Sequence, residues 1–253
     1  MMIWLFWALG LTVSTVVGIV IVRRARASGI VVFATLLSCY VISANILVPR
    51  LIELDMGYAT LIVASGSLIW PFTSQLSDMI NEIYGRRYAF GAITLAYLSN
   101  LLFVTFVYAV GAAEPTWNLQ QEEWWREYFF ASGRILLASS TTFLVVGFID
   151  VMLFGWLKRL AGHYERRASS AGLAASAVAR SAASDAFSMC ADSVLFAVLA
   201  FTFTLPWNDV VTIILGSLAL KVTLAVVDTP WFVVFKLYTR DVERADLREG
   251  EVR

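Results

Sequence analysis

The stretch PFTSQLSDMINEIYGRR, residues 71–87, follows an apolar run and carries three polar side chains at helical spacing. Asp78, Asn81 and Glu82 stand at positions i, i+3 and i+4, so they project from a helix in one direction. Polar and ionisable groups at membrane depth are costly, and they usually face a bundle interior or a water-filled cavity. The stretch therefore predicts a membrane protein with a polar site inside it.

The composition favours the same class. Of the 253 residues, 59% are hydrophobic and only 15% are charged, whereas soluble domains average roughly 45–50% apolar and about 25% charged. The apolar residues form long runs, which are typical of membrane-spanning helices and not of the alternating segments of a transmembrane barrel. A formal net charge of zero argues against a nucleic-acid partner. The only histidine, His163, lies in a basic loop, so we expect no histidine-based metal site and no cofactor.

Seven apolar segments are each long enough to cross about 30 Å of hydrocarbon at about 1.5 Å per residue. They are Met2–Val22, Ile30–Val48, Tyr58–Leu76, Ala89–Val110, Phe129–Trp156, Ser181–Phe203 and Val210–Phe235. The loops between them are short, so the sequence predicts one all-α integral-membrane bundle without a soluble domain. The first segment has its basic cluster after the apolar run, which is not typical of a secretory signal, and we interpret it as a retained helix.

The loops differ in charge on the two sides of this bundle. If the seven segments alternate in direction, one side receives most of the cations, which are Arg23, Arg24, Arg26, Arg86, Arg87, Lys158, Arg159, Arg166, Arg167, Arg180, Lys236 and Arg240. The opposite loops hold only Arg50 and Arg126 together with several carboxylates. By the positive-inside rule, the N-terminus is expected outside and the C-terminus in the cytoplasm of a multi-pass plasma-membrane protein.

Other polar residues fall within the apolar segments. They are Asn45, Arg134, Asp150, Asp185, Asp192, Lys221 and Asp228. Lys221 and Asp228 lie on one helix face but about 10 Å apart along the axis, so each needs a partner from another helix or a ligand. Several interpretations stay open here. Arg134 either snorkels to the interface or balances charge, and Asp150 and Glu82 either serve the site or pair with nearby basic residues.

Two further alternatives concern uncharged residues. Asn45 either bonds across helices or contacts a ligand. Trp70 and Phe72 either stack on a flat ligand or pack in the core. An excess of carboxylates at depth has two uses, because a carboxylate can accept parallel hydrogen bonds from a guanine-type base edge or can hold a transported proton.

The opening stretch resembles a motif of the queuosine precursor transporter family, which is also described as a family of vitamin uptake transporters. The matching residues are Pro71, Phe72, Thr73, Asp78, Asn81, Glu82, Tyr84, Gly85, Arg86 and Arg87. Later segments resemble the family at Asn45, Arg134, Ala138, Ser139, Asp150, Arg180, Ser184, Asp192, Ser193, Lys221, Asp228, Thr229 and Pro230. Gly147 and Met189 stand where many members of the family have Gln.

The resemblance spans about residues 33–238 and implies a six-helix core, similar to the substrate-binding subunits of energy-coupling-factor transporters. The chain then divides into an additional N-terminal helix with its basic loop (1–28), the transporter core (29–238) and a charged cytoplasmic tail (239–253). The implied activity is uptake of 7-deazaguanine compounds, namely preQ0, preQ1 or queuine.

A substrate site follows from this resemblance. Its expected binding residues are Asp78, Asn81, Glu82, Asp192, Asp228, Asn45, Trp70 and Phe72, and its expected charge-balancing or coupling residues are Arg134, Asp150 and Lys221. The chain has no phosphate-binding loop motif for ATP. Facilitated, proton-coupled and ATPase-assisted uptake stay open, as does a homodimer. The alternative functions are a subunit of an ATP-driven vitamin-type importer and, less favoured, an integral-membrane enzyme.

Overall fold

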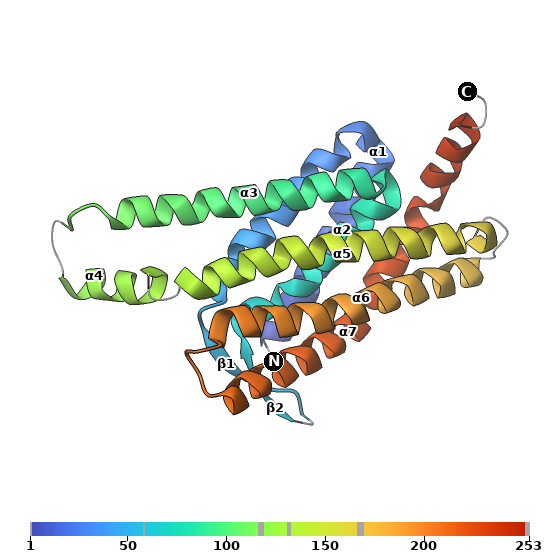
Figure 1. Ribbon diagram of the computed structural model, residues 1–253. Coiled ribbons are helices and arrows are strands. Elements are labelled where there is room, and N and C mark those ends of the chain that lie inside the picture. The colour runs from blue at the N-terminus through green and yellow to red at the C-terminus, as the bar shows by residue number, and fades with distance from the viewer. Residues whose placement is uncertain (1, 58, 116–118, 131–132, 166–169, 251–253) are drawn as a thin grey trace.

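The computed structural model describes the whole chain except residues 1, 58, 116–118, 131–132, 166–169 and 251–253, and it is a bundle of long helices with a β-hairpin at one end (Figure 1). The long helices are α1 (Met2–Leu47), α3 (Arg86–Gly111), α5 (Gly133–Glu165), α6 (Ser170–Phe201) and α7 (Trp207–Gly250). The shorter elements are β1 (Leu51–Asp55), β2 (Thr60–Ala64), the 3₁₀ turn η1 (Ser65–Leu68), α2 (Trp70–Tyr84), α4 (Leu119–Trp125) and the π-helical turn η2 (Arg126–Phe130). Within the described part, five helices are long and apolar enough to cross a membrane, which confirms the predicted class.

Helix α1 contains both of the first two predicted segments, because it folds back on itself at Ala25. The backbone there leaves the helical region (φ −149°, ψ 52°) within the basic stretch that was expected to be a loop. Ser14 and Tyr40 would be roughly 39 Å apart in a straight helix, yet their hydroxyl oxygens are 2.6 Å apart. The two arms of α1 therefore pack side by side.

The third predicted segment, Tyr58–Leu76, is wrong as a helix. Its first part is strand β2, which pairs antiparallel with β1 and matches Leu51 to Ala64. The expectation of a purely helical fold is corrected by this hairpin. The physical reason lies in the residues: Thr60–Ala64 is rich in β-branched and aliphatic residues, and Gly66 and Pro71 then interrupt any continuous helix.

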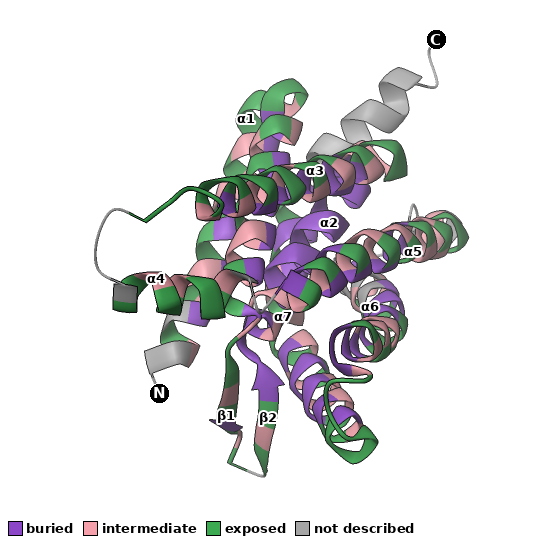
Figure 2. Cartoon of the chain, turned by 60° about the vertical axis from the view of Figure 1, so that its left-hand side comes forward, coloured by how far each residue is buried: buried purple, intermediate pink, exposed green. Residues whose placement is uncertain are grey.

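Helix α2 supplies the end of the interrupted segment. Pro71 stands in its first turn, where a missing N–H costs nothing, and Gly85 ends it with φ +83°. At about 1.5 Å per residue the helix is roughly 22 Å long, too short to cross the hydrocarbon alone. Every residue from Pro71 to Ile83 is buried, so α2 is an internal helix of the bundle (Figure 2).

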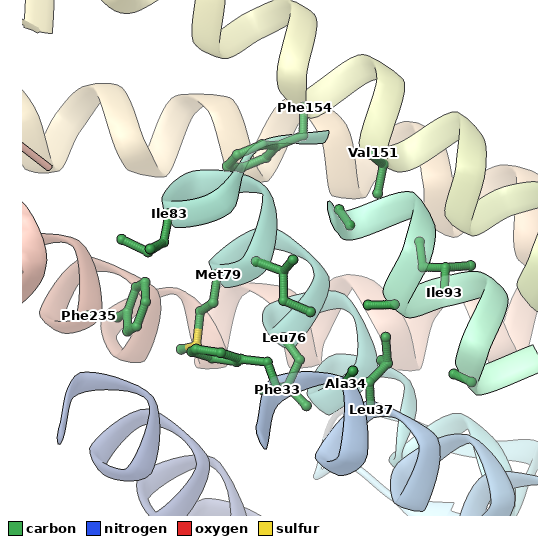
Figure 3. Packing of buried hydrophobic residues seen from close by; sticks show 14 of the residues in the cluster. Phe33, Ala34, Leu37, Leu76, Met79, Ile83, Ile93, Val151, Phe154 and Phe235 are labelled. Carbon is green, nitrogen blue, oxygen red and sulfur yellow. The ribbon is translucent and has the colours of Figure 1, made fainter. Parts of the chain in front are cut away.

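One side of α2 forms the largest apolar cluster of the described residues. Leu76, Met79 and Ile83 pack against Phe33 from α1 and Phe235 from α7 (Figure 3). The remaining predicted segments correspond to α3, α5, α6 and α7, whose ends differ from the prediction by several residues. The core therefore fixes α2 between the arms of α1 and the three C-terminal helices.

The last turn of α2 gathers basic residues from four other segments. The Arg26 guanidinium donates to the carbonyl of Ile83 over 3.0 Å, and Lys158, Arg180 and Lys236 reach Glu82. The predicted basic side is thus one end of the bundle. The hairpin of β1 and β2 lies at the other end, and the membrane side that each end faces stays a prediction.

Candidate functional site

A cavity of about 870 Å³, including its open mouth, lies between the second arm of α1 and helices α2, α5, α6 and α7. Five of the predicted site residues line it: Asn45, Trp70, Asp150, Asp192 and Lys221. Each comes from a different helix, so the tertiary fold brings together groups that are up to about 175 positions apart in the chain. Hollows between the helices of a bundle are among the places where small-molecule sites occur.

Helix α2 presents a polar face to this cavity. Trp70, Thr73, Ser74 and Ser77 line it and stand at positions i, i+3, i+4 and i+7. The opposite side of the same helix carries the apolar cluster of the core (Figure 3). The division explains why a fully buried helix is amphipathic: one face packs against side chains and the other meets an internal hollow.

Asp150 of α5 is the carboxylate at the inner wall of the cavity. Its Oδ1 accepts hydrogen bonds from the hydroxyls of Ser184 and Ser188 on α6, each 2.6 Å long. Within the described part of the chain, no protein group donates to its second oxygen, Oδ2, so this is the atom available to a ligand. The two hydroxyl donors stabilise the buried carboxyl group, because a carboxylate without partners would be strongly destabilising.

Lys221 of α7 also lines the cavity and pairs with Asp192 of α6. Its ammonium lies 3.3 Å from the hydroxyl of Ser193 and 5.9 Å from the centre of the Trp70 ring. The expectation that Lys221 would find its partner on another helix is confirmed. The contact with Trp70 places an aromatic ring and a cation at one edge of the hollow.

Asn45 enters the cavity wall from α1 and is held by a neighbour on α5. Its amide nitrogen donates to the Ser140 hydroxyl over 3.1 Å, and Asn100 of α3 donates to the same oxygen over 2.8 Å. Asn45 therefore bonds across helices and also lines the cavity, and its contact with a ligand stays a prediction.

The other predicted site residues lie elsewhere. Phe72 packs edge-on against Trp7, with ring centres 6.0 Å apart, on the opposite side of α2 from the cavity. The amide of Asn81 donates to the carbonyl of Val151 over 3.0 Å. Arg134 is exposed, and its guanidinium donates to the carbonyl of Leu199 over 2.9 Å. These three residues hold helices together and do not line the cavity.

Glu82 also lies outside the cavity, in an ion cluster at the basic end. Its carboxylate is fully buried and pairs with Arg180 at 3.0 Å, with Lys158 at 3.5 Å and with Lys236. The four residues come from α2, α6, α5 and α7. The cluster joins four of the helices that surround the cavity at a level nearer to the basic end.

Asp78 and Asp228 are buried, with 2% and 8% of their surfaces exposed, but neither lines the cavity. Asp228 lies close enough to Asp185 for their charges to interact, and Asp185 accepts a hydrogen bond of 2.8 Å from Ser74. Ser74 lines the cavity, so its hydrogen bond connects Asp185 and Asp228 with the cavity wall.

The helix rise places the end of the opening motif away from the cavity. Glu82 lies eight residues after Ser74, so it is about 12 Å further along α2. Helical spacing indicates a side of the helix, but it does not give the depth of the hollow.

Sequence reasoning missed the hydroxyl groups of the cavity. They belong to Ser67, Thr73, Ser74, Ser77, Ser139, Ser140, Thr142 and Ser188. The spacing of Trp70, Thr73, Ser74 and Ser77 was visible in the sequence and is the signal that could have found the α2 face.

Among the described residues, no group of three or more His, Cys, Asp or Glu side chains is arranged to hold a metal ion.

This fold and this hollow define a multi-pass helical membrane protein with an internal polar site. The family model described as "Putative vitamin uptake transporter" matches residues 64–235, and the chain belongs to this family of membrane uptake transporters. The match agrees with the resemblance to queuosine precursor transporters seen in the motifs. It begins in β2, so α1 and β1 lie outside it. No curated protein and no solved structure matches the chain.

Proposed function

We propose that this transporter imports 7-deazaguanine compounds, namely preQ0, preQ1 or queuine, through the cavity. The observation that carries the proposal is the placement of Asn45, Trp70, Asp150, Asp192 and Lys221 around one hollow inside a membrane bundle. Family membership supplies the transport activity. The chemistry of the lining supports the substrate class.

A 7-deazaguanine is flat and carries adjacent N–H donors along one edge. The Asp150 carboxylate, whose Oδ1 is already held by Ser184 and Ser188, accepts such donors at Oδ2. Trp70, Phe143 and Phe196 line the same cavity and offer ring faces for a planar ligand. Hydroxyl groups around the wall satisfy the remaining polar atoms of the base.

The Glu82 cluster provides the inner closure in this proposal. The cavity lining reaches from Val48 and Gly66, near the hairpin end, to Asp150 and Ser188, and the ion pairs of Glu82 lie beyond it toward the basic end. Passage inward requires α2 to separate from α5, α6 and α7 at this level. The ion pairs of Glu82 are then broken and re-formed in each transport cycle.

The test is uptake of radiolabelled preQ0, preQ1 and queuine by cells that lack their own carrier. We expect the wild-type chain to confer uptake of at least one compound and Asp150→Asn to reduce it by about 10- to 100-fold, because a hydrogen bond to a charged group is lost. Thr105→Val is the matched control, since this hydroxyl is exposed and bonds only to the carbonyl of Leu101. No uptake of any of the three by wild-type protein in the membrane would refute the proposal.

A further inference from the structure

Ser140 is the centre of a hydrogen-bond network that reaches from the cavity wall into α3. Its hydroxyl donates to the carbonyl of Leu136 over 2.7 Å and accepts from the amide nitrogens of Asn45 and Asn100. A hydroxyl has one hydrogen and two lone pairs, so these three bonds use its full capacity. The network therefore has one arrangement of donors and acceptors.

That arrangement fixes the orientation of the Asn45 amide. The Leu136 carbonyl can only accept, so it takes the hydroxyl hydrogen, and Asn45 must turn its NH₂ group toward Ser140. The carbonyl oxygen Oδ1 of Asn45 is left without a hydrogen-bond donor from the described residues, at a position that lines the cavity. Asn45 thus presents an acceptor to whatever occupies the hollow.

Asn100 occupies a position where an apolar residue would pack well. It is fully buried on α3 in a stripe with the buried residues Ala96, Val104 and Val107, at helical spacing. Its own carbonyl oxygen, Oδ1, has no hydrogen-bond partner in the described structure. An unsatisfied buried polar atom is costly, so an Asn here needs a compensating interaction. Among the described residues, the bond to Ser140 is the only one that this side chain makes.

We propose that Asn100 is a positioning residue that acts through Ser140 to hold the Asn45 amide in one orientation, so that Asn45 selects ligands with an N–H donor at that point of the cavity. This inference rests on the proposed function and deepens it. It concerns how the site discriminates among ligands, because Asn100 does not line the cavity itself. A site that presents a fixed acceptor rejects an analogue that lacks the matching donor.

The experiment compares half-saturation constants for uptake of 7-deazaguanine and three analogues, each with one N–H donor position removed or methylated. We expect wild-type protein to reject at least one analogue. The ratio of the half-saturation constant for the rejected analogue to that for 7-deazaguanine is expected to fall by about fivefold in Asn100→Leu and in Ser140→Ala. Ser140→Ala removes the group that holds the Asn45 amide nitrogen, and Asn100→Leu empties one lone pair of the Ser140 hydroxyl, so that the hydroxyl can turn and present its hydrogen to Asn45. The double variant is expected to show no further fall, since both changes act through one contact.

Thr94→Val is the control on the same helix, because Thr94 bonds only to the carbonyl of Phe90 and lies outside the cavity. Asn100→Ala replaces Asn100→Leu if the larger side chain prevents folding, as judged by the amount of monodisperse protein from the membrane. A role confined to packing predicts equal loss of maximal uptake for all four ligands with unchanged ratios, and that result would overturn the inference. Failure of wild-type protein to carry 7-deazaguanine compounds would instead refute the proposed function.

Discussion

Lys221 of α7 and Asp192 of α6 form an ion pair at the wall of the cavity, with the lysine ammonium 5.9 Å from the centre of the Trp70 ring. The side chain of Lys221 is 3% exposed and that of Asp192 is 15% exposed, so the aspartate is the member that faces the open part of the hollow. The pair links the two C-terminal helices of the bundle directly to the ligand site. It also balances the charge of the cation inside the bundle.

Breaking this pair should impair both stability and uptake. Lys221→Met leaves Asp192 without its partner, and Asp192→Asn leaves a buried ammonium, which costs about 3–5 kcal/mol in comparable buried pairs. We expect each single variant to lower the midpoint of thermal unfolding of the purified protein. The double variant Lys221→Met/Asp192→Asn should recover part of that loss, because neither charge remains. A double variant that is less stable than both single variants would contradict a direct pairing.

The Glu82 cluster should be more sensitive to loss of its carboxylate than to loss of one cation. Glu82→Gln leaves Arg180, Lys236 and the partly exposed Lys158 around a neutral amide, and we expect the free energy of unfolding to fall by about 3–5 kcal/mol. Adding Lys236→Met to Glu82→Gln should restore part of the stability by removing one buried charge. Thermal unfolding followed by intrinsic fluorescence provides the measurement, and an unchanged midpoint in Glu82→Gln would show that the cluster does not hold the helices together.

Gly216 of α7 lets the hairpin pack closely on the bundle. A Cβ atom at this position would lie 2.6 Å from the carbonyl oxygen of Ile62 in β2, so Gly216→Ala must shift the hairpin or the helix. We expect a loss of about 1–3 kcal/mol, as for other overpacked contacts. Gly91→Ala is the matched control, because Gly91 is an exposed helical glycine with no atom within 4 Å of the added methyl group. The control should be neutral or slightly stabilising. Equal thermal midpoints for the two variants would argue against the close contact.

The orientation of the bundle predicts which loops an impermeant thiol reagent can reach. Cys39 and Cys190 are exposed on the bundle, so both are first replaced by Ser. In that background, Glu114→Cys lies after α3 at the end away from the basic cluster, and Arg87→Cys lies at the basic end; both positions are exposed. We expect whole cells to label the first variant and to label the second only after lysis. The reverse pattern would invert the proposed topology.

The sequence by itself determined the class of protein, because long apolar runs and the uneven distribution of Lys and Arg depend only on which residues occur and in what order. It also indicated polar residues at helical spacing from Asp78 to Glu82 and supplied the motifs of the transporter family. It did not reveal the hairpin. The residues from Thr60 to Ala64 are as apolar as a membrane-spanning segment, and hydropathy does not distinguish such a strand from a helix.

Only the tertiary structure decided which polar residues form the site. Helical spacing gave the direction of Asp78, Asn81 and Glu82, but their distance from the hollow depends on how deeply α2 sits against its neighbours. The same packing gathered Asn45, Asp150 and Lys221 from helices far apart in the chain. Buried polar groups must meet partners within hydrogen-bond reach, and those partners are chosen by helix packing, which local sequence does not encode.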